Sequence, residues 1–152
     1  MLTQAIPNAS PRRNRLLYVL DDRPGIAFVE LIVAGRKDLV LLRALDAEQG
    51  LALARSHHPD AILIDLNLPG MSALDFMKRL RAAPGTETTP ILALGAHTSP
   101  AAFARAIDAG FFLYLAKPLQ AAPFLEALDY ALEFNAVERA ERGIPRPLKE
   151  SP

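Results

Sequence analysis

Five short apolar runs, separated by segments with helical spacing, limit what this chain can fold into. The runs lie at residues 16–20, 39–42, 61–64, 91–94 and 112–115, and polar or turn residues bound each of them. Short, nearly continuous apolar runs are typical of strands that are buried on both faces of a parallel sheet. The sequence therefore predicts five such strands.

The segments between the runs carry apolar residues at the spacing of amphipathic helices. Ser72 and Ser99 are expected to cap the third and fourth helices, and Gly110 is expected to end the fourth. Five strands that alternate with five helices predict an α/β fold with helices on both faces of the sheet. The expected architecture is flavodoxin-like, a doubly wound five-stranded parallel sheet of strand order 2-1-3-4-5.

Composition and charge argue against several classes of function for this chain. Seventeen basic and seventeen acidic residues balance, so no net positive charge favours nucleic acid, and no cysteine is present for disulfides or thiolate chemistry. No apolar run approaches the length of a membrane span, and the first residues do not resemble a signal peptide. We expect a cytoplasmic protein with a flexible lead-in over residues 1–14, one domain over 15–138 and a C-terminal tail over 139–152.

Charged residues follow three of the five runs. Asp21 and Asp22 follow the first run, Asp65 follows the third, and Lys117 follows the fifth. In a doubly wound sheet the site lies beyond the carboxyl ends of the strands, so these side chains should converge. Clustered carboxylates repel one another unless a cation relieves them, and an all-oxygen set suits magnesium. The sequence thus predicts a magnesium site beside one ammonium group.

Other kinds of site lack their sequence patterns. No G-x-G-x-x-G or P-loop pattern opens a helix after any run, so a nucleotide site has no phosphate cradle. His57, His58 and His97 are too few and too scattered for a metal site or a catalytic triad.

Two segments resemble the receiver domains of bacterial two-component response regulators. Residues 62–71, ILIDLNLPGM, resemble the strand and loop around the phosphoacceptor of that family. Residues 109–118, AGFFLYLAKP, resemble its last strand and lysine-proline pair. The resemblance extends from about residue 16 to residue 132.

The resemblance implies a role for each matching residue. Asp65 would accept a phosphoryl group, and Lys117 would pair with the phosphoryl oxygens. Asp21, Asp65 and the backbone carbonyl of Asn67 would bind magnesium. Tyr114 matches the aromatic switch position of the family.

The chain departs from the family pattern at one metal-binding position and at one switch position. Aligned with the family, Leu20 stands at the first of two acidic positions, so magnesium binding should be weak. Asp22 is a further candidate ligand if its loop shifts. Gly95 stands where the family has a Ser or Thr hydroxyl, so the usual link from the phosphoryl group to the fourth helix is missing.

Two functions therefore stay open. The first is a phosphorelay receiver, not an enzyme, that is phosphorylated on Asp65 by a histidine kinase or phosphotransfer protein and has no attached output domain. The second is a degenerate receiver that binds a protein partner independently of phosphorylation. In either case we expect the chain to act on an unknown downstream protein and to bind neither nucleic acid nor a membrane. A homodimer through the fourth helix, fifth strand and fifth helix is a further candidate.

Overall fold

The computed structural model describes residues 13–20 and 22–143 of the chain. The candidate ligand Asp21, most of the expected lead-in and the end of the expected tail lie outside the described residues.

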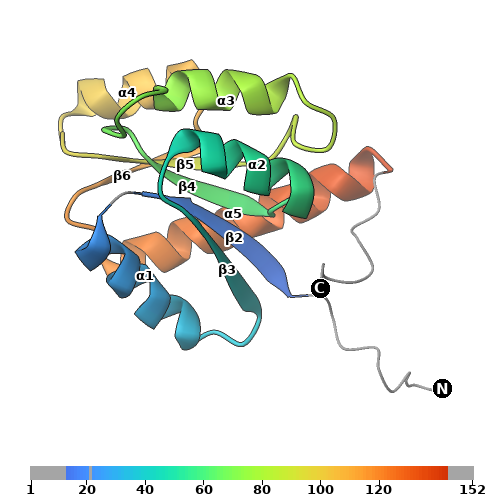
Figure 1. Ribbon diagram of the computed structural model, residues 1–152, viewed down its shortest axis with the longest axis horizontal. Coiled ribbons are helices and arrows are strands. Elements are labelled where there is room, and N and C mark those ends of the chain that lie inside the picture. Colours follow the sequence, from blue (N-terminus) through green and yellow to red (C-terminus); the bar gives the residue numbers. More distant parts are fainter. Residues whose placement is uncertain (1–12, 21, 144–152) are drawn as a thin grey trace.

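Strands and helices alternate along the described chain (Figure 1). The strands are β2 (Asn14–Val19), β3 (Leu39–Ala44), β4 (Ala61–Asp65), β5 (Ile91–Gly95) and β6 (Leu113–Ala116). The helices are α1 (Arg23–Ala34), α2 (Ala47–His57), α3 (Ala73–Arg81), α4 (Pro100–Ala109) and α5 (Ala121–Glu141). Each predicted apolar run corresponds to one of these strands.

The five strands form one parallel sheet in the order β3-β2-β4-β5-β6. This order confirms the predicted flavodoxin-like 2-1-3-4-5 topology. β2 and β4 lie side by side in the middle of the sheet, with Val19 opposite Ile64. The carboxyl ends of β2, β4 and β5 therefore meet at one edge, where the charged residues were expected.

Helices cover both faces of the sheet, as Figure 1 shows. α2, α3 and α4 pack on one face, and α1 and α5 pack on the other. Alternate side chains of β2 enter the two cores: Leu17 and Val19 pack under α2 and α3, while Leu16 and Tyr18 pack under α1 and α5. Burial on both faces explains why the strands read as continuous apolar runs.

The predicted helix boundaries around α3 and α4 are confirmed. The Ser72 hydroxyl accepts the backbone N–H of Asp75 at 3.0 Å, and the Ser99 hydroxyl accepts that of Ala102 at 3.2 Å. Gly110 ends α4 with a φ of 114°, a left-handed conformation that favours glycine.

The last helix is longer than the apolar pattern indicates. α5 continues to Glu141, whereas the tail was expected to begin at residue 139. Asn135 and Arg139 are buried and continue the inward stripe of the helix with polar side chains. The amide of Asn135 donates to Asp60, whose carboxylate also accepts the backbone N–H of Arg15. Polar contacts, which an apolar pattern cannot reveal, hold this end of the helix.

Among the described helices, none combines the length and the apolar character that crossing a membrane requires.

Candidate functional site

Asp65 is the last residue of β4 and lies at the carboxyl edge of the sheet. Its side chain is buried and uses both oxygens. Oδ1 accepts the backbone N–H of Asn67 at 2.8 Å, and Oδ2 lies 2.7 Å from Nζ of Lys117. Lys117 is thus brought to Asp65, as the sequence predicts, and Asn67 contacts Asp65 through its backbone N–H.

Lys117 reaches Asp65 from beyond β6, across the end of β5. Its backbone N–H donates to the carbonyl oxygen of Gly95 at 2.8 Å, which fixes the start of the loop, and the Lys117–Pro118 peptide bond is cis. The Lys117 side chain is 35% exposed while that of Asp65 is 8% exposed. An ammonium group has three N–H donors, so Lys117 can bind an arriving anion while it contacts Asp65.

Leu20 and Asp22, which precede α1, differ in burial. β2 ends at Val19, and the Leu20 side chain is 2% exposed in the core under α1 and α5. Asp22 is exposed, precedes α1 as its N-cap residue and lines a pocket with Lys117. The Leu20 side chain is therefore part of this core, and its match to an acidic position of the family stays a prediction from the sequence. The alternation of side chains along a strand does not fix the direction of the Asp22 side chain, because Asp22 lies beyond the end of β2.

The pocket beside Lys117 has a volume of about 600 Å³. The start of α1, the end of β5 and residues 117–119 form its walls. Asp22 and Lys117 supply its charges, and its other lining includes the side chains of Tyr18 and Phe28.

Tyr18 is a residue of this site that the sequence analysis missed. Its side chain is 1% exposed, yet it lines the same pocket as Asp22 and Lys117. Burial raises the pKa of Tyr18 well above its usual value, and the negative charges of Asp22 and Asp65 raise this pKa further. The available signal was a single hydroxyl-bearing residue within the otherwise aliphatic first run.

The residues at this edge fit a magnesium ion by their chemistry. Asp22 and Asp65 are carboxylates, and Asn67 follows in the loop with a backbone carbonyl. Within residues 13–20 and 22–143, no group of three or more His, Cys, Asp or Glu side chains is close enough to hold a metal. Magnesium does not need such a group, because it commonly uses one or two carboxylates and keeps several waters.

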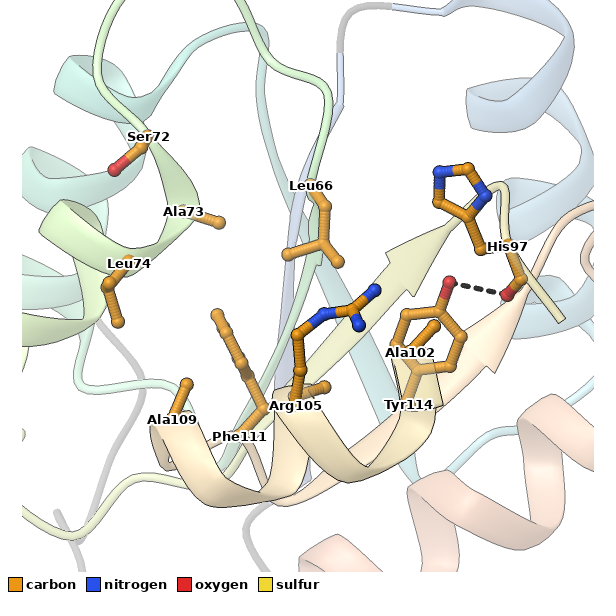
Figure 2. A pocket seen from close by; sticks show the side chains of 11 residues that line it. Leu66, Ser72, Ala73, Leu74, His97, Ala102, Arg105, Ala109, Phe111 and Tyr114 are labelled. Carbon is orange, nitrogen blue, oxygen red and sulfur yellow. Dashed lines mark hydrogen bonds between the residues drawn. The ribbon is translucent and has the colours of Figure 1, made fainter. Parts of the chain in front are cut away.

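Gly95 and Tyr114 lie against each other behind this site. A Cβ atom at Gly95 would come within 2.9 Å of Cε1 and Cζ of the Tyr114 ring, and closer still to its hydroxyl. The hydroxyl donates to the carbonyl oxygen of His97 at 2.7 Å, as Figure 2 shows, and the ring lies 4.8 Å from that of Phe103. The absent side chain at residue 95 leaves the space that Tyr114 fills.

Comparison with known proteins agrees with this geometry. The sequence profile of the response regulator receiver domain matches residues 17–129. The chain belongs to the response regulator receiver family. Receiver domains are phosphoryl-accepting modules of two-component signalling, and the predicted family is thus confirmed.

Several proteins resemble this receiver. The sensory/regulatory protein RpfC of Xanthomonas campestris pv. campestris is 34% identical over 118 residues, which make up 76% of this chain but only 16% of RpfC. A crystal structure of a response regulator from Chloroflexus aurantiacus aligns with a TM-score of 0.73 and 32% identity, over 80% of this chain and 99% of that one.

A third relative bears on the metal. The receiver domain of the sensor histidine kinase PA1611 from Pseudomonas aeruginosa aligns with a TM-score of 0.71 and 25% identity, over 80% of this chain and 98% of that chain. Its crystal structure contains a magnesium ion coordinated in the active-site cleft.

Proposed function

We propose that this receiver accepts a phosphoryl group on Asp65 from a histidine kinase or a phosphotransfer protein. The observation that carries the proposal is the 2.7 Å contact between Asp65 Oδ2 and Lys117 Nζ at the carboxyl edge of the sheet. This contact supports the proposal because an ammonium group beside the Asp65 carboxylate would bind the incoming phosphoryl oxygens.

The chemistry would be an in-line transfer. An oxygen of Asp65 forms a bond to phosphorus while the bond from phosphorus to the donor histidine nitrogen breaks, and that nitrogen keeps the electron pair. Lys117 compensates the charge of the phosphoryl oxygens, and the Asn67 N–H orients the carboxylate. Positioning and charge compensation are the main means of catalysis in such transfers, so no further acid or base is required.

Asp22, Asp65 and the carbonyl of Asn67 would hold a magnesium ion, with Asp21 as a further ligand. When bound, the ion would neutralise negative charge on the transferring group. These residues would keep the ion beside Asp65. A cytoplasmic location, a downstream protein partner and the absence of nucleic acid from its targets stay predictions from the sequence.

The direct test is intact mass after incubation with acetyl phosphate and magnesium. We expect the wild-type chain to gain one phosphoryl group, and we expect Asp65→Asn or excess EDTA to prevent the gain. Unmodified wild-type protein at saturating donor would overturn the proposal.

A second function is favoured by one observation, the position of Tyr114. Packing against Gly95 and the bond to His97 hold this ring without any contribution from Asp65. Its surface could therefore bind a protein partner independently of phosphorylation. Equal affinity of a partner for the unmodified, phosphorylated and Asp65→Asn forms would establish this function in place of the first.

A further inference from the structure

Tyr18 is placed unusually for a residue in the middle of a buried strand. It lies in β2 between aliphatic neighbours, and its side chain is almost fully buried. Its ring nevertheless extends to the carboxyl edge of the sheet, where it lines the pocket that contains Asp22 and Lys117. A phenol at this position presents one O–H donor to the charged end of the pocket.

Gly25 shows how close the phenol and the Asp22 carboxylate are. A Cβ atom at Gly25 would lie 2.8 Å from Oδ2 of Asp22 and 3.1 Å from Oη of Tyr18. Both oxygens therefore border the same small space, which only a residue without a side chain leaves open. Leu20 closes the third side, with its Cδ2 atom 2.6 Å from the same point.

Asp22 is the N-cap residue of α1, but its carboxylate does not cap the helix. The N-cap side chains of α2, α3 and α4 each accept a backbone N–H of their own helix. The Asp22 side chain makes no such bond, and Pro24 in the first turn has no N–H to offer. The carboxylate lies instead beside the space it shares with Tyr18.

We propose that Tyr18 is a positioning residue for the divalent-cation site, and that its hydroxyl orients the Asp22 carboxylate toward the cation. The inference rests on the proposed function, because it assigns Asp22 to the magnesium site. An oriented carboxylate loses less conformational freedom on binding, so the cation binds more tightly. The hydroxyl is also a neutral donor, so it adds no charge that competes with the cation.

The test is the magnesium affinity of Tyr18→Phe, measured by calorimetry at neutral pH with magnesium chloride alone. The substitution keeps the ring in the core and removes only the hydroxyl. We expect affinity to fall about tenfold, the change that corresponds to about 1.4 kcal/mol. Tyr130→Phe is the matched control, because Tyr130 is exposed on α5 and should leave the affinity unchanged.

A double-mutant cycle shows whether Tyr18 acts through Asp22. Asp22→Asn should weaken magnesium binding by itself. In that background Tyr18→Phe should cause little further loss, because the carboxylate that the hydroxyl orients is gone. Equal losses from Tyr18→Phe in both backgrounds would overturn the inference, as would an unchanged affinity in the single variant.

Failure of the inference and failure of the proposed function give different results. Phosphorylation of the wild-type chain by acetyl phosphate tests the proposed function without any change at Tyr18. A wild-type chain that is phosphorylated and binds magnesium no better than Tyr18→Phe would overturn the role of Tyr18 alone. A wild-type chain that neither binds magnesium nor gains mass would overturn both.

Discussion

The ring of Tyr114 fills the space that a side chain at Gly95 would occupy. A Cβ atom there would lie 2.9 Å from two ring carbons, and the ring is fixed further by the bond from its hydroxyl to His97. A side chain at residue 95 and this ring position thus exclude each other. From the sequence, glycine at position 95 was expected to remove a contact with the phosphoryl group. In the structure it also leaves the space that the Tyr114 ring occupies.

Gly95→Thr should push the Tyr114 ring out of this position. We expect loss of the hydrogen bond to His97 and a destabilisation of about 1 to 3 kcal/mol, the usual cost of adding atoms to a filled space. Amide chemical shifts at His97 and near Phe103 would report the movement, and denaturant unfolding would report the cost.

The control is the same change in a chain with Tyr114→Ala, where the added side chain has room. There Gly95→Thr should be nearly neutral. An equal cost in both backgrounds would show that the clash with Tyr114 is not the cause.

Leu20→Asp should destabilise the protein and should not improve magnesium binding. The Leu20 side chain is 2% exposed in the core, so a carboxylate there would be buried without a partner. We expect a loss of about 3 to 5 kcal/mol in the free energy of unfolding, measured with urea. Leu31→Asp on α1 is the matched control, because Leu31 is 74% exposed and should change stability by less than about 0.5 kcal/mol.

Tighter magnesium binding by a stable Leu20→Asp protein would contradict this expectation.

The fold could be predicted because its signals are local and repeated. Apolar runs mark strands buried on both faces, and Ser72, Ser99 and Gly110 mark helix ends that the structure confirms. The pairing of Asp65 with Lys117 followed from topology, because the ends of parallel strands meet at one edge. The end of α5 was predicted too early, because polar contacts replace apolar ones there.

The site was predicted less completely, because it depends on which side chains lie close together in the folded chain. Leu20 was matched by alignment to a metal position, and the structure shows that its side chain is buried with Leu16 and Tyr18 in the core under α1 and α5. Tyr18 was read as one more apolar residue, although its hydroxyl reaches the pocket of Asp22. The contact between Tyr114 and Gly95 depends on two strands lying side by side, which neither motif shows alone.

Lys117→Gln should separate phosphorylation from magnesium binding. The change removes the cation 2.7 Å from Asp65, so we expect phosphorylation by acetyl phosphate to slow at least tenfold. Magnesium should bind as tightly or more tightly, because a positive charge near the ion is removed. Rates from intact mass and affinities from calorimetry would be compared with Lys78→Gln, an exposed site on α3. Parallel losses of rate and affinity would contradict the role given to Lys117.

Alkaline pH should destabilise the protein through Tyr18. The folded pKa of Tyr18 is raised, chiefly by burial and then by Asp22 and Asp65, so the folded state keeps a proton that the unfolded chain loses above about pH 10. This stability is fully present below about pH 10 and falls as the pH rises further, by up to about 1.4 kcal/mol per pH unit.

Urea unfolding at pH 9, 10 and 11 would measure this effect. The decline should be smaller in Tyr18→Phe than in wild type, whereas Tyr130→Phe should follow wild type. Parallel declines in wild type and Tyr18→Phe would show that Tyr18 does not cause the effect.

The most direct measurement locates the phosphoryl group in the chain. Borohydride reduces an aspartyl phosphate to homoserine, so peptide mass mapping after phosphorylation and reduction identifies the modified residue. We expect homoserine at residue 65 in the wild-type chain incubated with acetyl phosphate and magnesium, and none in the presence of EDTA. Homoserine at Asp22, or at no residue, would contradict the assignment of Asp65 as the phosphoacceptor.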